Sequence, residues 1–191
     1  MKQLAVFASG NGTNAEKIFE QFRNHATIEV AVLFTNNSKA GVIDRANRFK
    51  IPIEIFDKPT LTKTDKVLNK LREYQVDWIA LAGFMLLVPP SLVEAFPNRI
   101  INIHPALLPA YGGKGMYGMN VHRAVVESKE PATGITIHYV NEQYDDGAVI
   151  FQASCPINPE DTAETVAQKV HQLEYQYYPQ IIEEAIGKYE I

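Results

Sequence analysis

The sequence predicts an α/β fold of the Rossmann-like type, in which a mostly parallel sheet carries helices on both faces. Over about the first hundred residues, short apolar runs alternate with segments of helical periodicity, as in repeated strand–helix–strand units. A glycine-rich turn, Ser9–Asn14, directly follows the first apolar run. Later in the chain, two apolar runs are separated only by a polar loop. This change indicates a mixed or antiparallel extension of the sheet in the C-terminal half.

In the first half, each expected strand is a short apolar run bounded by glycine, proline or polar residues. The expected strands are Leu4–Ala8, Ile28–Thr35, Ile53–Phe56, Asp77–Ala82 and Arg99–Ile103. Each expected helix has apolar residues three or four positions apart on one face. The expected helices are Thr13–Phe22, Ala40–Phe49, Thr62–Tyr74 and Pro90–Phe96. Thr60 or Thr62 is the expected N-cap of the third of these helices.

In the second half, two strands lie between two helices. The expected elements are a helix over Asn120–Ser128, strands over Gly134–Val140 and Ala148–Cys155, a polar loop over Asn141–Gly147, and a long helix over Thr162–Ile186. Asp161 or Thr162 is the expected cap of the long helix, and Pro179 is an expected bend. We expect all 191 residues to form a single domain.

The composition restricts the class of protein. A chain of 191 residues with 46% hydrophobic content can bury one substantial core. Neither a secretory leader nor an apolar run of bilayer length is apparent, so we expect a cytoplasmic protein without a membrane partner. The net charge of −4 disfavours nucleic acid as the main partner. The single Cys155 excludes an internal disulfide, and we expect a structural thiol rather than a nucleophile.

The most informative motif is Asn102–Pro109, which reads Asn-Ile-His-Pro-Ala-Leu-Leu-Pro. It follows a strand-like run, so it lies where a strand leaves the sheet. Asn102 and His104 are two positions apart, which places their side chains on the same face of an extended backbone. An amide donor beside an imidazole suits a reaction that develops negative charge on a carbonyl oxygen.

The turn Ser9–Asn14 is a candidate phosphate site. Glycines let the backbone approach a ligand closely, and the free amides at a helix N-terminus attract anions. The turn lacks the glycine spacing of a dinucleotide fingerprint and the lysine of a Walker loop, so it suits one phosphate monoester. The alternative is an ordinary strand-to-helix turn capped by Thr13.

Several other polar residues have both a structural and a functional interpretation. His138 lies in an expected strand, and Asp145 and Asp146 precede Gly147 in the following loop. In isolation these residues indicate a structural histidine and a solvated turn. If the loop folds over the Asn102–His104 strand end, a carboxylate could hold the imidazole and favour its protonated form.

The remaining histidines carry weaker signals. His25 and His122 are expected on the surface or on a helix face. His171 precedes Glu174 by three positions on the last helix, so the two side chains share a face. No third ligand can be placed near them, and we therefore expect no metal site.

Taken together, the motifs resemble the phosphoribosylglycinamide formyltransferase family of folate-dependent formyltransferases, and the resemblance covers nearly the whole chain. The motifs that carry it are Ser9–Asn14, Ala82–Met85, Asn102–Pro109, Gly134–His138 and Asp145–Gly147, in that order. The Asn-Ile-His-Pro-x-Leu-Leu-Pro segment with a later Asp-x-Gly is specific to folate-dependent formyltransferases and hydrolases. The glycine–asparagine loop narrows the match to the ribonucleotide enzymes.

The resemblance implies an enzyme that transfers a formyl group from 10-formyltetrahydrofolate to the amine of glycinamide ribonucleotide in purine synthesis, without a metal. Residues up to about 100 would form the ribonucleotide phosphate-binding half, and residues from about 101 to 191 the catalytic and folate-loop half. The implied catalytic residues are Asn102, His104 and Asp145. The implied substrate contacts are Gly10, Asn11, Gly12, Thr13 and Glu174. The implied folate contacts are Met85, Leu86, Leu87, Val88, Asn102, Asn141 and Asp145. Both small molecules are implied partners of a monomer or homodimer.

Two departures and three alternatives stay open. Asp146 occupies a position that is often glycine, and the Ala110–Gly118 segment is longer than in many relatives. Its Lys114 could contact the substrate phosphate, the folate glutamate tail, or only solvent, and Lys63 could lie near the folate.

Methionyl-tRNA formyltransferases share the motif but are longer proteins with an RNA-binding domain. Formyltetrahydrofolate hydrolases carry an N-terminal regulatory domain, whereas the first strand here is expected to begin at residue 2 or 3. A non-enzymatic nucleotide-binding module is the remaining alternative.

Overall fold

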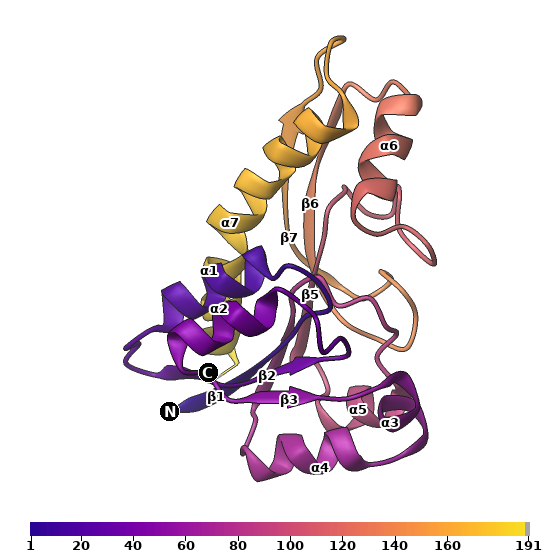
Figure 1. Ribbon diagram of the computed structural model, residues 1–191. Helices are drawn as coiled ribbons and strands as arrows, with labels where there is room; N and C mark the ends of the chain where they lie inside the picture. The colour runs from indigo at the N-terminus through magenta and orange to yellow at the C-terminus, as the bar shows by residue number, and fades with distance from the viewer. Residues whose placement is uncertain (190–191) are drawn as a thin grey trace.

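A computed structural model describes residues 1–189 and contains one seven-stranded sheet with helices on both faces (Figure 1). The strand order is β3-β2-β1-β4-β5-β6-β7. The strands are β1 (Lys2–Phe7), β2 (Ile28–Thr35), β3 (Ile53–Ile55), β4 (Trp78–Leu81), β5 (Ile100–His104), β6 (Ala132–Tyr139) and β7 (Val149–Pro156). Neighbouring strands from β3 to β5 are parallel, whereas β6 and β7 are antiparallel to their neighbours. The predicted fold class is therefore confirmed.

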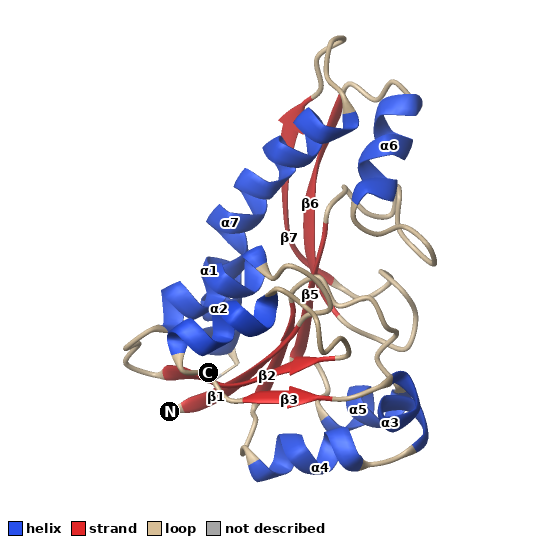
Figure 2. Ribbon diagram, viewed as in Figure 1, coloured by secondary structure: helices blue, strands red, loops and turns tan. Residues whose placement is uncertain are grey.

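The helices cover the sheet in two groups (Figure 2). They are α1 (Thr13–Phe22), α2 (Val42–Phe49), α3 (Lys58–Lys63), α4 (Lys66–Glu73), α5 (Pro90–Ala95), α6 (Met119–Glu127) and α7 (Ala163–Lys188). One apolar core contains buried residues of α1, α2 and α7, such as Ile18, Val42 and Ile182. A second core contains buried residues of α4 and α5, such as Leu71 and Leu92. The α6 helix packs against α7 beside the β6–β7 pair.

The expected helix over Thr62–Tyr74 is wrong, because two helices occupy this region. Asp57 is the N-cap of α3, where its carboxylate accepts a hydrogen bond from the Thr60 amide at 2.8 Å. The Thr64 hydroxyl donates to the Thr60 carbonyl at 2.7 Å and accepts from the Lys66 amide at 3.3 Å. Thr64 thus ends one helix and supports the start of the next, because its hydroxyl competes with the helical hydrogen bonds.

The long C-terminal helix agrees more closely with the sequence. Thr162 is its N-cap and forms a reciprocal capping box with Thr165. The helix runs from Ala163 to Lys188 without interruption at Pro179. The helix follows β7 in the chain and contacts β5, β6 and β7.

The sheet reverses its order between β1 and β4, and this reversal opens a crevice. The chain moves outward from β1 through β2 to β3, then returns to place β4 on the other side of β1. Connections that leave the carboxyl ends of β1 and β4 therefore diverge, which is where open α/β sheets bind ligands. Ser9 joins the two connections: its hydroxyl accepts from the Met85 amide at 3.0 Å and donates to Asn36 Oδ1 at 2.6 Å.

A buried tyrosine ties α7 to the strands that border this crevice. The Tyr178 side chain is fully buried. Its hydroxyl lies 2.8 Å from the Leu81 carbonyl oxygen and 3.0 Å from the Ile101 carbonyl oxygen. These carbonyls belong to the last residue of β4 and the second residue of β5, so one hydroxyl links the two neighbouring strands. Within residues 1–189, no helix combines the length and the apolar character needed to cross a bilayer.

Replacing Tyr178 by phenylalanine should lower the free energy of unfolding by about 1–3 kcal/mol, because the Leu81 and Ile101 carbonyls lose the one buried hydroxyl hydrogen that they share. Urea denaturation provides the measurement. Tyr177→Phe is the matched control, since Tyr177 is half-buried against Phe151 and its hydroxyl has no hydrogen-bond partner among the described residues. The control should stay within about 0.5 kcal/mol of the wild type. Equal losses in the two variants would contradict the structural role of the Tyr178 hydroxyl.

Candidate active site

A cavity of about 490 Å³ lies at the carboxyl ends of β1, β4 and β5, a volume typical of small-molecule sites. Its walls come from the connections after these strands, the segment before α6, the β6–β7 loop, α6 and α7. The lining residues are Thr13, Asn14, Gly83, Phe84, Met85, Asn102, Ile103, His104, Pro105, Gly113, Lys114, Gly115, Met116, Tyr117, Gly118, His122, Tyr144, Asp145, His171 and Glu174.

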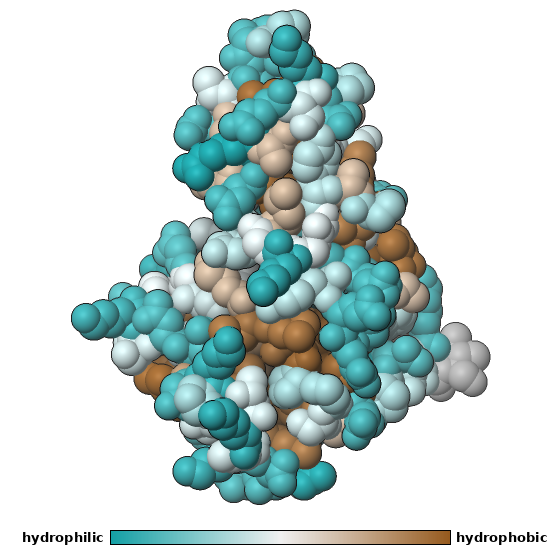
Figure 3. All heavy atoms as spheres, turned by 90° about the vertical axis from the view of Figure 1, so that its right-hand side faces the viewer, coloured by the Kyte–Doolittle hydropathy of each residue, from teal (hydrophilic) through white to brown (hydrophobic). Residues whose placement is uncertain are grey.

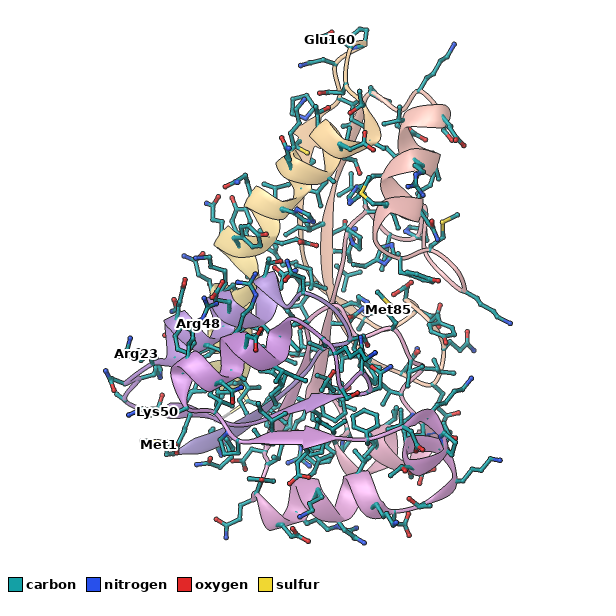
Figure 4. The ribbon with its side chains drawn as sticks, viewed as in Figure 1. Met1, Arg23, Arg48, Lys50, Met85 and Glu160 are labelled. Atoms are coloured by element: carbon teal, nitrogen blue, oxygen red, sulfur yellow. The ribbon has the colours of Figure 1, made fainter. Side chains whose placement is uncertain are left out.

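The outer part of the site carries exposed apolar side chains. Met85 is 52% exposed and Leu87 is 38% exposed, although both follow the buried strand β4. Figure 3 shows a hydrophobic area near the middle of the face that carries these loops, and Figure 4 labels Met85 on the same side. An apolar rim beside a polar interior suits a ligand that has an aromatic or other apolar part.

Asn102 is oriented by a chain of hydrogen bonds that begins at a backbone carbonyl. His138 Nδ1 lies 2.8 Å from the Tyr139 carbonyl oxygen, so this nitrogen carries the proton that is donated. In the neutral ring, His138 Nε2 then accepts from Asn102 Nδ2 at 3.1 Å. The amide nitrogen of Asn102 retains a second hydrogen, which can be donated to a ligand in the cavity.

His104 and Asp145 face each other across the strand end. His104 is the last residue of β5, and its Nε2 donates to the Tyr111 carbonyl oxygen at 2.7 Å. Its Nδ1 lies 3.5 Å from Asp145 Oδ2, and that oxygen also accepts from the Gly113 amide at 2.9 Å. The other oxygen, Asp145 Oδ1, lies 3.7 Å from His138 Nε2. The structure thus brings together the three predicted catalytic residues and adds His138.

The protonation states differ in part from the expectation. Burial lowers the pKa of His104 more than the neighbouring Asp145 charge and the Tyr111 carbonyl raise it. The Asp145 carboxylate thus favours the protonated ring, as expected, but burial outweighs it and the net shift of the His104 pKa is downward. Burial by itself would raise the pKa of Asp145, but His138, His104 and the Gly113 amide together hold it below its usual value. Asp145 is accordingly a carboxylate at neutral pH.

The glycine-rich turn presents unpaired backbone amides. Gly12 is the N-cap of α1 with φ of 76°, and no side chain caps this end of the helix. Among the described residues, no oxygen accepts a hydrogen bond from the amides of Gly10, Asn11 or Gly12. Thr13 reaches the cavity wall but does not cap the helix. An anionic ligand could satisfy these donors.

A second polar group lies on the α7 side of the cavity. Glu174 is 6% exposed, and its Oε2 accepts from Asn14 Nδ2 at 3.0 Å. Burial raises the pKa of Glu174 to about 7, although the Asn14 amide acts in the opposite direction. Asn14 Oδ1 and His122 Nδ1 are buried without a hydrogen-bond partner. Such atoms are suited to bind hydroxyl or amine groups of a ligand.

Of the two expected positions of His122, the structure shows a helix face and not the surface: His122 lies on the buried face of α6. Its side chain is 2% exposed and packs edge-on against His171, with ring centroids 6.3 Å apart. Burial, with the nearby His171 and His104, lowers the pKa of His122 to about 4. The sequence carried a signal for this position, because His122 is three residues before the buried Val125 on one helix face. Asn14 and His171 also line the cavity, although neither is among the ligand contacts that the sequence implies.

The other predicted site residues divide into two groups. Those that line the cavity are Thr13, Met85, Asn102, His104, Asp145 and Glu174. Those that lie outside its lining are Gly10, Asn11, Gly12, Leu86, Leu87, Val88 and Asn141. Asn141 donates its side-chain amide to Asp146 within their own loop at 3.2 Å. Lys114 lines the cavity, whereas Lys63 ends α3 away from it.

No group of three or more His, Cys, Asp or Glu side chains within residues 1–189 is arranged to hold a metal ion. His171 and Glu174 share a helix face, as their spacing indicates, but each belongs to the cavity wall. Cys155 is half-buried, and burial raises the pKa of its thiol. A thiol in this state is a poor nucleophile.

Comparisons with known proteins agree with one another. A family model described as formyl transferase matches residues 2–182. A chloroplastic phosphoribosylglycinamide formyltransferase of Arabidopsis thaliana is 42% identical over 95% of this chain, which spans only 64% of that relative's length. The phosphoribosylglycinamide formyltransferase of Bacillus subtilis is 39% identical, with 98% of this chain and 96% of the relative covered. A crystal structure of the enzyme of the same name from Bacillus halodurans superposes with a TM-score of 0.88 at 37% identity, covering 98% and 96% of the two chains.

The raised pKa of Glu174 predicts a specific pH dependence of stability. The folded protein holds this proton to about pH 7, above the ordinary value of 4.5. The resulting stability is therefore fully present below pH 4.5 and is lost as the pH rises through 7. We expect the wild type to lose roughly 3 kcal/mol relative to Glu174→Gln over this range. Urea denaturation of both proteins at several pH values provides the measurement, and a constant difference would contradict the prediction.

Proposed function

The chain belongs to the formyl transferase family, and we propose that it transfers the formyl group of 10-formyltetrahydrofolate to the amine of glycinamide ribonucleotide in purine biosynthesis. The observation that carries this proposal is the placement of Asn102, His104 and Asp145 on one cavity that also adjoins the glycine-rich turn. An oxyanion donor and a proton-handling pair thus lie within reach of a ligand whose phosphate is held by the turn. The names of the relatives described above, phosphoribosylglycinamide formyltransferases, support this proposal.

The two ligands have separate binding regions in this proposal. The amides of Gly10–Thr13 hold the ribonucleotide phosphate, and Glu174 with Asn14 binds polar groups of the same ligand. The folate lies against the Met85–Val88 segment and the loop that carries Asn141 and Asp145. Leu87 and Met85 are exposed there, which supports an apolar contact with the pterin ring system.

Proton transfer and charge stabilisation follow from the side-chain geometry. The substrate amine attacks the formyl carbon, and the electron pair of the carbonyl bond moves to oxygen. Asn102 donates its free amide hydrogen to that oxygen, and His104 Nδ1, 3.5 Å from Asp145 Oδ2, can share the proton that Asp145 accepts from the amine. The Asp145 carboxylate accepts the proton that leaves the amine and returns it to the folate nitrogen as the carbon–nitrogen bond breaks. None of these steps needs a metal, and both ligands are small molecules.

The reaction itself is the most direct test. Purified protein should convert 10-formyltetrahydrofolate to tetrahydrofolate only when glycinamide ribonucleotide is present, which absorbance and product chromatography can follow. Equal turnover without the amine would instead favour a formyltetrahydrofolate hydrolase. Ribonucleotide binding without turnover of either kind would favour a non-enzymatic nucleotide-binding module.

The two adjacent aspartates provide a matched pair of variants. Asp145→Asn removes the charge between His104 and His138, so we expect kcat to fall by roughly 10²–10⁴-fold. Asparagine tolerates the positive φ of 54° at this position, so the loop should keep its shape. Asp146→Asn should change kcat by about twofold or less, because Asp146 pairs only with Asn141 in the loop.

Measurement of kcat and kcat/KM for both variants decides the assignment, since a role in the transition state lowers both. If Asp146→Asn is the impaired variant and Asp145→Asn is nearly normal, the catalytic carboxylate has been assigned to the wrong residue.

A further inference from the structure

The glycine-rich turn rests directly on the first turn of α2. A Cβ atom at Gly12 would lie 2.4 Å from the Val42 side chain, and one at Gly41 would lie 2.8 Å from Asn11 Oδ1. The Val42 amide donates to the Gly10 carbonyl at 3.2 Å. The turn and the helix therefore touch through backbone atoms, and the helix can determine which way the turn faces.

Arg45 of α2 makes further contacts with the turn. Its Nε donates to the Asn11 carbonyl at 2.8 Å, and its Nη2 lies 3.4 Å from Asn11 Oδ1. Its Nη1 forms an ion pair with Glu16 of α1. The Arg45 and Glu16 side chains are only 19% and 20% exposed. One guanidinium group thus links the turn, α1 and α2, a use that suits its rigid fork of donors.

These bonds orient the amides of the turn by a simple geometric rule. In a planar trans peptide, the C=O and N–H groups point in opposite directions. The Gly10 carbonyl and the Asn11 amide share one peptide group, and the Asn11 carbonyl and the Gly12 amide share the next. Because α2 holds both carbonyls, both amides point away from α2. They are among the amides that have no partner within the described residues.

We propose that Arg45 is a positioning residue that orients the amides of the turn for a phosphate group, an inference that rests on the proposed function. Arg45 does not line the cavity, and it acts through the Asn11 peptide rather than by contact with the ligand. Glu16 pairs with both Arg45 and Arg48 and therefore offsets only part of their charge, so a charge-matched control is needed to isolate the geometry of the Arg45 donors. The role concerns the affinity for the ribonucleotide and not the formyl transfer step.

Arg48 provides a matched control on the same helix. Its Nη2 contacts Glu16 Oε1 at 2.5 Å, as Arg45 contacts the other oxygen, but its side chain is 62% exposed and does not touch the turn. Figure 4 labels the Arg48 side chain, which projects from α2. Arg48→Gln therefore removes one positive charge and one Glu16 contact while it leaves the Asn11 peptide held by Arg45.

The experiment measures steady-state kinetics of Arg45→Gln, Arg45→Lys and Arg48→Gln. Both Arg45 variants should raise KM for glycinamide ribonucleotide on the order of tenfold, because the fork to Asn11 is lost. Their kcat at saturation and their KM for 10-formyltetrahydrofolate should stay within about twofold of the wild type. Arg48→Gln should leave all three constants within about twofold. Circular dichroism confirms that each variant is folded.

Three outcomes would overturn the proposal: restoration of ribonucleotide affinity by Arg45→Lys, an equal loss in Arg48→Gln, or an unchanged KM in folded Arg45 variants. The first two would assign the effect to charge alone. Gly12→Ala separates these results from failure of the proposed function, because its Cβ displaces the turn from Val42. If Gly12→Ala weakens ribonucleotide binding while the Arg45 variants do not, the turn binds phosphate without help from Arg45. If the wild type neither binds nor formylates the ribonucleotide, the proposed function itself is wrong.

Discussion

The Asp145 carboxylate lies between two buried imidazoles, and the arrangement of the cavity around Asn102 and His104 depends on its position. The loop that carries it must fold tightly back onto β6. A Cβ atom at Gly147 would lie 1.6 Å from the Tyr139 carbonyl oxygen, so only glycine permits this path. The Gly113 amide holds the same carboxylate from the opposite loop. A fixed charge among largely buried side chains can act strongly on both rings.

Backbone carbonyls, rather than other side chains, determine how the two imidazoles are protonated. Tyr111 accepts from His104 Nε2, and Tyr139 accepts from His138 Nδ1. Each bond leaves the opposite ring nitrogen available for the cavity side, so His138 can orient Asn102 and His104 can take up a proton. Because these carbonyls belong to the backbone, the protonation pattern depends on the fold and not on a further side chain.

The glycine-rich turn and the cluster of Asn102, His104 and Asp145 are connected through α2, the crevice between β1 and β4, and β5. Ser9 joins the connections after β1 and β4, while Arg45 holds the turn from the α2 side. Tyr178 links the neighbouring strands β4 and β5 from α7. Few of these contacts involve residues close in sequence, so the two ligands would meet at a place that the whole sheet defines.

The sequence by itself determined the alternating strand and helix pattern, the antiparallel extension, and the motif at the end of β5, because periodicity and turn residues act locally. The sequence pattern predicted one helix over Thr62–Tyr74. Two helices form in this region, because the Thr64 hydroxyl competes with the helical hydrogen bonds. Only the tertiary structure decided that Asp145 reaches His104 and that His122 is buried in the cavity. It also decided the net direction of the His104 pKa shift, because desolvation depends on every element packed around the ring. Long-range contacts and the desolvation of a particular side chain arise from the assembled sheet, and no local pattern of residues encodes them.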